Sequence, residues 1–370
     1  MDRLPVELIT PICFLACTDG GPTACALSLV SHHIRAASRP ARFYSVSFNG
    51  PRVITAVPPF LTRLKEEHEE TRRGDAPPRV RHLFVSVSPP KGESQTMILK
   101  VYRVTIDMLL RAVAQDVETL SLVQSYMQGD QSANPIALDV KFPRLRELTI
   151  SGVLFSSPQL DSAPFPTLRR LHVLRGPSPS EWAPLTPNVT YLRISEVPDL
   201  HVLPVIWTSG LSTFGRDPNA DSAEAEEHYP HLQQIIVQPA PHTHFHRLDF
   251  YKRYVHELWD MQPTARVPMY LVPADEDAGG DPWNKSEFAR VKAKNLWLAA
   301  VEGSGRCWQA DDKYAHFNRT GDDLPLYLRQ WSEEPINDME APPIQDAGEA
   351  AEPIAHGGGG IRDEVPTRTL

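Results

Sequence analysis

The sequence predicts an α/β protein in which three short N-terminal helices precede a curved solenoid with a parallel sheet backed by helices and loops. Three observations support this prediction. The first 48 residues contain short apolar segments of helical spacing, the middle of the chain repeats one strand pattern, and amphipathic segments separate the first repeats. Strands that alternate with helices run parallel, because the helix returns the chain to the same end of the sheet.

The first helical segment begins near Pro5. Pro5 suits a first helical turn, because that turn has no use for the N–H that proline lacks, and Asp2 is placed to cap it. Pro11 predicts a kink or a later start. The apolar residues of this segment recur at the spacing of one helix face, and they are Leu4, Leu8, Ile9, Ile12 and Leu15.

Two further helical segments follow the break at 19–22, which reads Asp-Gly-Gly-Pro. The second contains the apolar residues Ala24, Leu27, Leu29 and Val30, and the third covers 34–37. Three helices in about forty residues are too few to build a stable core without partners. We therefore expect another protein to bind this region.

Two stretches of this region resemble the motifs of an F-box. Residues 4–9 read Leu-Pro-Val-Glu-Leu-Ile, and residues 27–35 read Leu-Ser-Leu-Val-Ser-His-His-Ile-Arg. The following stretch, 38–46, resembles the exit of the F-box in fungal proteins, where the chain enters its first strand. Two positions depart from the family pattern: Ser31 replaces the usual Cys, and Ile34 replaces the usual Trp. The resemblance covers residues 1–48.

The F-box resemblance implies a substrate-recognition subunit of an SCF-type cullin–RING ubiquitin ligase, located in the cytoplasm, the nucleus or both. It implies docking on a Skp-family adaptor, which connects the chain to a cullin. The residues that it assigns to this contact are Leu4, Pro5, Leu8, Ile9, Ile12, Leu27, Leu29 and Val30. Such a subunit acts by bringing a protein substrate close to the ubiquitin-conjugating enzyme and is not itself an enzyme.

Other interpretations of the N-terminal region remain open. The helices could be a structural cap on a protein-interaction scaffold that has no link to a ligase. A signal peptide is disfavoured, because Glu7 and two prolines interrupt the apolar run.

Six segments in the middle of the chain carry apolar residues at relative positions 1, 4 and 6. They start at Val80, Val117, Leu145, Leu168, Val189 and Leu232, which lie 37, 28, 23, 21 and 43 residues apart. The pattern resembles degenerate leucine-rich repeats, whose period is about 20–29 residues, so that the last gap corresponds to two periods. Two of the segments are preceded by a Phe-Pro pair, at Phe142 and Phe165. A single α/β domain with a coincidental period is the alternative.

The segments between the first strands, 51–73 and 102–115, have the apolar spacing of amphipathic helices. Towards the end of the repeats we expect a helix over 248–259, a strand over 267–272 and a helix over 283–300, which together close the open end of the array. The predicted division of the chain is an F-box-like region 1–48, a substrate-binding repeat region 49–305, an extension 306–336 and a disordered acidic tail 337–370.

Composition narrows the class of protein further. The 370 residues have a net charge of −9, which argues against a nucleic-acid partner. No apolar run reaches the length of a membrane span, so we expect no membrane partner. Four cysteines without Cys-x-x-Cys spacing indicate a reducing compartment.

Three groups of residues carry side chains that could perform chemistry. The histidines within 242–246 alternate as metal ligands on a strand can, but the flanking prolines favour a surface turn. The acidic loop 275–281 lacks the residue order of a calcium site. Cys13 and Cys17 are expected to be buried as small apolar residues. No catalytic residue, metal or cofactor is predicted, and the sequence does not identify the protein substrate.

Overall fold

The computed structural model describes residues 4–71, 77–87, 95–124, 136–138, 140–151, 155–156, 163–174, 182–197, 229–239, 267–273, 282–304 and 308–309. The chain divides into two units, residues 1–332 and 333–370, and all of the described residues belong to the first. The predicted tail, the helix over 248–259 and the two candidate ion sites at 242–246 and 275–281 lie outside the described residues.

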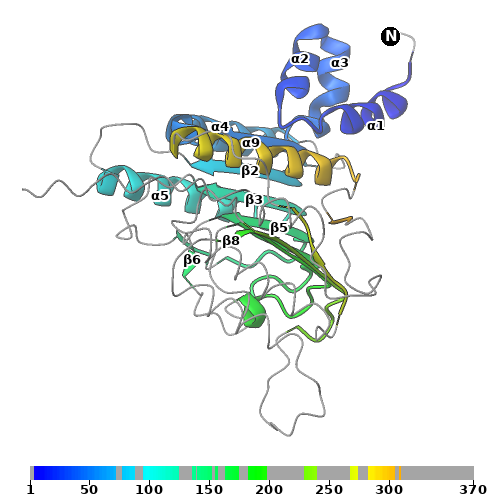
Figure 1. Ribbon diagram of the computed structural model, residues 1–370. Helices are drawn as coiled ribbons and strands as arrows, with labels where there is room; N and C mark the ends of the chain where they lie inside the picture. The colour runs from blue at the N-terminus through cyan, green and yellow to red at the C-terminus, as the bar shows by residue number, and fades with distance from the viewer. Residues whose placement is uncertain are drawn as a thin grey trace, which may run out of the picture. The chain divides into compact units, whose positions relative to one another are not determined.

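An eight-stranded sheet is the centre of the first unit (Figure 1). All of its strand pairs are parallel, and the order of the strands in the sheet follows the order in the chain. The predicted α/β class with a parallel sheet and helices is therefore confirmed. In sheet order the strands are β1 (Ser45–Asn49), β2 (His82–Val87), β3 (Thr119–Gln124), β5 (Glu147–Ser151), β7 (Arg170–Leu174), β8 (Tyr191–Val197), β9 (Gln234–Pro239) and β10 (Met269–Leu271). A separate parallel pair consists of β4 (Ile136–Ala137) and β6 (Phe155–Ser156).

Each of the six repeat segments supplies one strand of the sheet, as the apolar pattern predicts. Equivalent leucines lie opposite one another, so that Leu120 pairs with Leu148 and Leu148 with Leu171. The prediction that the 43-residue gap spans two periods is wrong for the sheet, because β8 pairs directly with β9. The chain between these two strands is thus a longer connection within one repeat step.

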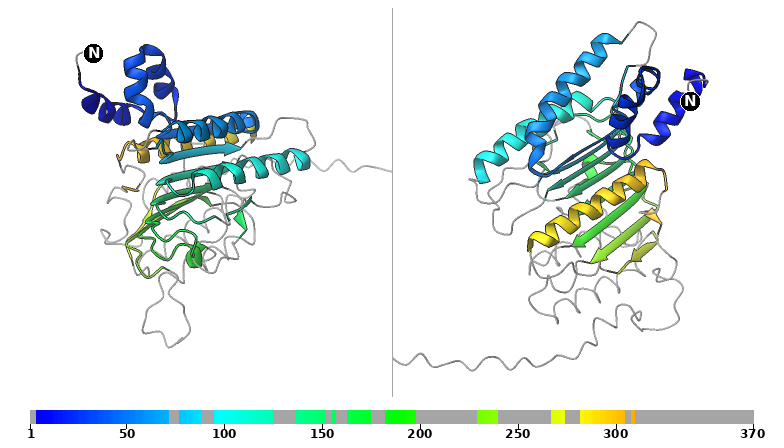
Figure 2. Two further views of the ribbon diagram at one scale, coloured as in Figure 1. Left: turned by 180° about the vertical axis from the view of Figure 1, so that it is seen from behind. Right: turned by 90° about the horizontal axis from the view of Figure 1, so that it is seen from above.

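Two long helices follow the first two strands. They are α4 (Val53–Glu70), which continues through Pro58 and Pro59, and α5 (Gln95–Val113), which begins earlier than the apolar spacing predicts. Figure 2 shows α4 and α5 on one face of the sheet. Their apolar residues and the inward side chains of the strands belong to one continuous core that runs from Phe43 to Leu271. Short 3₁₀ helices occupy Arg39–Ala41, Gly50–Arg52 and Ala183–Leu185.

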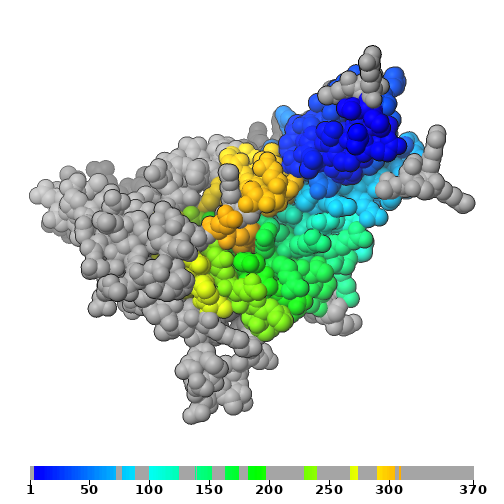
Figure 3. Space-filling view, turned by 90° about the vertical axis from the view of Figure 1, so that its right-hand side faces the viewer, coloured from blue at the N-terminus to red at the C-terminus, as the bar shows by residue number. Residues whose placement is uncertain are grey.

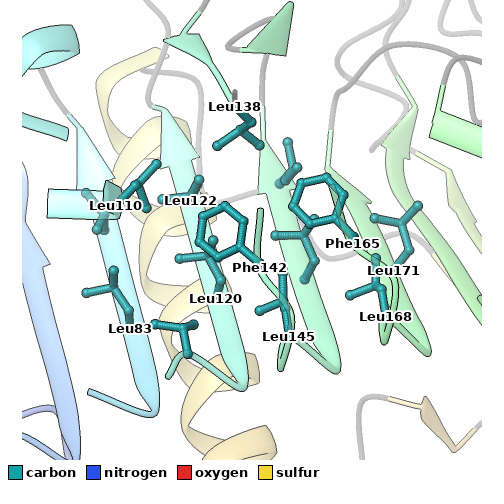
Figure 4. Packing of buried hydrophobic residues seen from close by; sticks show 14 of the residues in the cluster. Leu83, Leu110, Leu120, Leu122, Leu138, Phe142, Leu145, Phe165, Leu168 and Leu171 are labelled. Atoms are coloured by element: carbon teal, nitrogen blue, oxygen red, sulfur yellow. The ribbon is translucent and has the colours of Figure 1, made fainter. Parts of the chain in front are cut away.

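The Phe-Pro repeat starts have a packing role in this core. Phe142 and Phe165 are fully buried, and their rings stack with centroids 5.7 Å apart (Figure 4). The backbone N–H of Phe142 donates to Pro164 O in the next repeat, at 2.9 Å. Thr167 Oγ1 likewise donates to Leu145 O. The segments that precede β5 and β7 are thereby joined by hydrogen bonds, which the apolar pattern of the sequence does not predict.

The sequence predicts that the helix over 283–300 closes the open end of the array, and this prediction is wrong. The helix is present as α9 (Pro282–Val301), but it lies elsewhere. It packs on β2 and β3, on the face of the sheet opposite to α4 and α5 (Figure 2). The reason is a patch of apolar side chains on an otherwise polar face: Phe84, Val123 and Leu174 contact Ala293 and Trp297 of α9. Of the described helices, none has both the length and the apolar character of a membrane span.

Candidate interaction surface on the N-terminal helices

The N-terminal helical segment, residues 4–44, contains α1 (Val6–Ala16), α2 (Pro22–Val30) and α3 (His32–Ser38). Pro5 is the residue that precedes the first turn of α1, so the prediction of Asp2 as the cap is wrong. The helix does not begin late: it continues through Pro11 to Ala16.

The turn between α1 and α2 is held by Asp19. Its carboxylate accepts hydrogen bonds from the N–H of Gly21 at 3.2 Å and from the N–H and hydroxyl of Thr23 at 2.9 and 2.7 Å. Gly20 and Gly21 have φ angles of 84° and 125°, which residues with a side chain rarely adopt. The Asp-Gly-Gly-Pro break is therefore a defined helix start, in which Asp19 satisfies the N–H of Thr23 in the first turn of α2.

The two departures from the F-box pattern have structural roles here. Ser31 caps α3, because its hydroxyl accepts the N–H of Ile34 at 3.2 Å. A serine is a good helix cap, whereas a cysteine bonds weakly. Ile34 is buried in the small core between the helices. Both residues therefore stabilise the three-helix arrangement.

The three helices share a small core, and each helix buries one side against it. Its buried members are Ile9, Cys13, Cys17, Ala24, Ile34, Ala37 and Ala41. Both cysteines are free and buried. Burial, and then the nearby charges of Cys13, Asp19 and Cys25, raise the pKa of Cys17 to about 11, which keeps its thiol protonated at neutral pH. The prediction of buried, inert cysteines agrees with this environment.

The eight residues assigned to the adaptor contact divide by exposure. Ile9 is buried, with 5% of its surface exposed, and Leu27 is half-buried against the same small core. Six of the eight are exposed: Leu4, Pro5, Leu8, Ile12, Leu29 and Val30. The face predicted for α1 is thus split, because a helix with a core on one side directs Ile9 inward and Leu8 outward.

Two further exposed residues belong to this surface but are absent from the assigned set. Leu15 is 79% exposed on the side of α1 that carries Leu8 and Ile12, and Val6 is 43% exposed. Leu8, Ile12 and Leu15 have i, i+4, i+7 spacing on one helix face, and this spacing is the signal that would have added Leu15 to the assigned contact residues. We define the apolar N-terminal surface as Leu4, Val6, Leu8, Ile12, Leu15, Leu29 and Val30.

The helical segment is fixed to the sheet through the carboxylate of Glu67 on α4. Arg39, Arg42 and Arg63 each place a guanidinium nitrogen 2.5 Å from its oxygens, and only 1% of the Glu67 side chain is exposed. Burial alone would raise the pKa of Glu67, but the hydrogen bonds and charges of these arginines outweigh it and hold the pKa below its usual value. Two cations from the end of the helical segment are therefore bound to one buried anion of α4.

Backbone contacts reinforce the attachment to β1. The hydroxyl of Ser45 donates to Thr18 O at 3.2 Å, and the N–H of Ser47 donates to Gly20 O at 3.0 Å. β1 thus bonds to the turn between α1 and α2. It also crosses the predicted boundary at residue 48, because Ser45 to Asn49 pair with β2 as one strand.

Metal chemistry receives no support from the described part of the chain. Among those residues, no group of three or more His, Cys, Asp or Glu side chains is placed to hold an ion. His172 is buried and its Nε2 lies 2.9 Å from Ser195 Oγ, but both side chains belong to the polar face of the sheet, which α9 and Trp308 contact in part. The apolar N-terminal surface is the strongest candidate site.

Comparisons with protein-family models, with curated proteins and with solved structures find no match to this chain.

Proposed function

We propose that this protein is the substrate-recognition subunit of an SCF-type cullin–RING ubiquitin ligase. In this proposal the N-terminal helical segment is an F-box that binds a Skp-family adaptor, and the sheet and its helices are a leucine-rich-repeat-like region that holds a target protein. The protein itself performs no bond chemistry and acts by proximity.

The observation that carries the proposal is the apolar N-terminal surface. Leu8, Ile12 and Leu29 are 56%, 55% and 80% exposed on helices whose own core is already filled. Burial of such side chains against a partner contributes about 1.5–3 kcal/mol each, and a few of them dominate a typical interface. Several large apolar side chains left exposed on one small helical segment are characteristic of a binding site for another protein.

The attachment of the helices to the sheet also favours the proposal. A receptor that works by proximity benefits from a fixed distance between adaptor and target, because a rigid connection raises the effective concentration of the target at the catalytic partner. The Glu67 cluster and the bonds to β1 supply such a connection.

The decisive test is co-purification with a recombinant Skp-family adaptor. Leu8→Glu with Ile12→Glu places two charges in the apolar N-terminal surface, and we expect the affinity for the adaptor to fall by about 100-fold or more. Pro5→Ala with Leu4→Ala tests the opening motif and should also abolish co-purification.

The matched control is Val104→Glu with Met108→Glu on α5. These residues have the same i, i+4 spacing and similar exposure, 60% and 52%, but lie outside the N-terminal helices. The control should bind the adaptor like the unchanged chain, and both double variants should keep its melting temperature. Undiminished binding by the Leu8, Ile12 variant would eliminate the F-box proposal.

The second candidate is a protein-interaction scaffold without a ligase, in which the helices cap the sheet. The bonds from Ser45 and Ser47 to the α1–α2 turn favour a capping role. A cap predicts a well-behaved monomer, whereas a free binding surface predicts aggregation that co-expressed adaptor relieves. Light scattering of the chain with and without the adaptor distinguishes the two.

A further inference from the structure

The sheet has one apolar and one polar face. Neighbouring strands place Phe84, Ser121, Thr149 and His172 side by side on the polar face. All four side chains are nevertheless buried. A polar face that is withdrawn from water must be covered by another part of the molecule.

The C-terminal part of the chain covers this face. Ala293 and Trp297 of α9 pack on Phe84, Val123 and Leu174, with the rings of Trp297 and Phe84 5.6 Å apart. Further along, the indole N–H of Trp308 donates to Glu147 Oε1 at 3.1 Å, and its ring lies 6.4 Å from that of His172. Figure 3 shows the residues of α9, in gold, beside the blue N-terminal helices.

α9 packs well against the apolar side chains of this face, but it leaves several of the polar groups without hydrogen bonds. The hydroxyls of Ser86 and Ser121 and the indole N–H of Trp297 are buried, and none has a hydrogen-bond partner among the described residues. Ser86 lies between Asn49, which accepts a bond from Arg290 of α9, and Val123, which α9 contacts. Buried polar groups without partners weaken the closed arrangement relative to one in which they are bonded.

We propose that the face beneath α9 is an interaction surface for a helical segment of a partner protein, and that α9 keeps this surface closed until the segment replaces it. The partner segment presents a large apolar side chain in the place of Trp297, between Phe84 and Val123. It also carries polar groups that bond to the Ser86 and Ser121 hydroxyls. A segment with those groups gains bonds that α9 does not make, which is why it can displace a helix that is joined to the same chain.

Displacement of α9 would also reach the N-terminal helices. A Cβ atom built on Gly20, in the α1–α2 turn, would lie 3.4 Å from the Trp297 ring, and Arg290 bonds to Asn49 at the end of β1. Binding at the sheet and at the N-terminal surface are therefore connected through α9. Only this connection to adaptor binding at the N-terminal surface rests on the proposed function.

The first test compares two neighbouring residues on opposite faces of β2 in the full chain. Ser86→Cys places a thiol under α9, and Val85→Cys places one in the main core, with little change of volume in either case. Maleimide labelling is followed at each site by mass spectrometry under native conditions. If α9 opens by itself, Ser86→Cys is labelled about 100-fold faster than Val85→Cys, whose exposure requires global unfolding. Equal rates would overturn the proposal.

Substitutions of Trp297 test whether its contacts control the rate at which Ser86→Cys is labelled. Trp297→Phe keeps an aromatic ring and removes the unbonded N–H, so labelling of Ser86→Cys should slow or stay unchanged. Trp297→Ala removes the apolar contact and should accelerate it by about tenfold or more, with Val85→Cys labelling changed far less. Equal acceleration at both sites would mean that α9 is an inseparable part of the fold, and the proposal would fail.

The second test uses a fluorescent peptide of residues 282–304 as the probe of the surface. In fluorescence polarisation we expect it to bind the full-length Trp297→Ala chain at least about tenfold more tightly than the unchanged chain, whose own α9 competes. A further Val123→Glu substitution should abolish peptide binding. Binding that is equal in all three chains would contradict the proposal. Neither test involves the Skp-family adaptor. Failure of the proposal for the surface beneath α9 is therefore distinguishable from failure of the F-box assignment.

Discussion

Individual residues show that a departure from a family pattern can stabilise the same arrangement in another way. Ser31 is the residue at which α2 ends, its hydroxyl caps α3, and Ile34 is buried in the helical core. His82, at the start of β2, is a buried polar residue whose bonding is incomplete. Its ring packs edge-on against Tyr44, yet neither ring nitrogen has a hydrogen-bond partner among the described residues. Such a group makes the stability of the protein sensitive to pH.

We expect the free energy of unfolding to fall as the pH is lowered from 7 to 5.5, partly through His82. Burial, and then the charge of Arg81, lower the pKa of His82 to about 4. The unfolded chain, with an ordinary histidine pKa of about 6.5, therefore binds the proton more readily, and His82 accounts for about 1 kcal/mol of the loss. Urea unfolding at the two pH values measures it.

His82→Phe keeps the ring contact with Tyr44 and removes the titrating group. We expect this variant to be at least as stable at pH 7 and to lose about 1 kcal/mol less on acidification. The same acid sensitivity in both chains would show that His82 is not responsible. Burial, and then the charges of Arg193 and Lys292, also lower the pKa of the buried His172, so its protonation destabilises the folded protein in the same direction.

At the scale of elements, two contacts determine where the helices sit. The Glu67 carboxylate joins α4 to the end of the N-terminal helical segment, and the Phe84–Val123–Leu174 patch directs α9 to β2 and β3. Both contacts join elements far apart in the sequence. Neither contact stands out in the sequence, because they involve one Glu within a charged run and one apolar residue in each of β2, β3 and β7.

Glu67→Gln should lower the free energy of unfolding by about 2 kcal/mol, because it removes the negative charge on which three arginines converge. The pKa of Glu67 is depressed in the folded state, so its contribution is present at neutral pH and is lost as the pH falls below the ordinary carboxyl value of about 4.3. Chemical denaturation at pH 7 and at pH 3.5 measures both effects.

Glu66→Gln is the control for the Glu67 substitution. Glu66 is one residue away, half-exposed and, among the residues that the structure describes, paired with Arg63. We expect a change below about 0.5 kcal/mol, as for other surface ion pairs. If the two variants were equally stable, the Glu67 cluster would have no special role in holding the helical segment.

At the scale of the whole molecule, the main core is continuous from β1 to β10. Repeat arrays are stabilised mainly by contacts between neighbouring repeats, and long arrays can unfold in parts. Here α4 and α5 and the loops share one core with the strands, which ties the repeats together. We therefore expect the first unit to unfold cooperatively.

Substitutions at the middle and the end of the sheet test this cooperativity. Phe142→Leu should cost about 1–2 kcal/mol and Leu271→Ala about 2–4 kcal/mol, and each should shift one common transition. Far-ultraviolet circular dichroism and tryptophan fluorescence should report the same midpoint. A Leu271→Ala chain with two separate transitions would show instead that the repeats near β10 unfold independently.

The sequence alone determined which segments became strands and helices, because the period of the apolar residues decides that locally. The six repeat strands, α4 and the three N-terminal helices all follow from spacing, with errors of a few residues at their ends. Helix ends depend on capping and on neighbouring contacts, which is why Pro5, and not Asp2, precedes α1. The order of the sheet follows as well, because consecutive parallel repeats pair with their neighbours, except between β8 and β9, which pair directly although the 43-residue gap predicted two periods.

Only the tertiary structure decided which apolar residues remain in contact with solvent and which polar ones are withdrawn from it. Periodicity places Leu8 and Ile9 on one helix face, but the small core formed by three helices buries Ile9 and leaves Leu8 exposed. It likewise brings α9, about 160 residues after β3, onto that strand. Contacts between distant segments depend on shape and on burial summed over many side chains, and no local pattern contains that information.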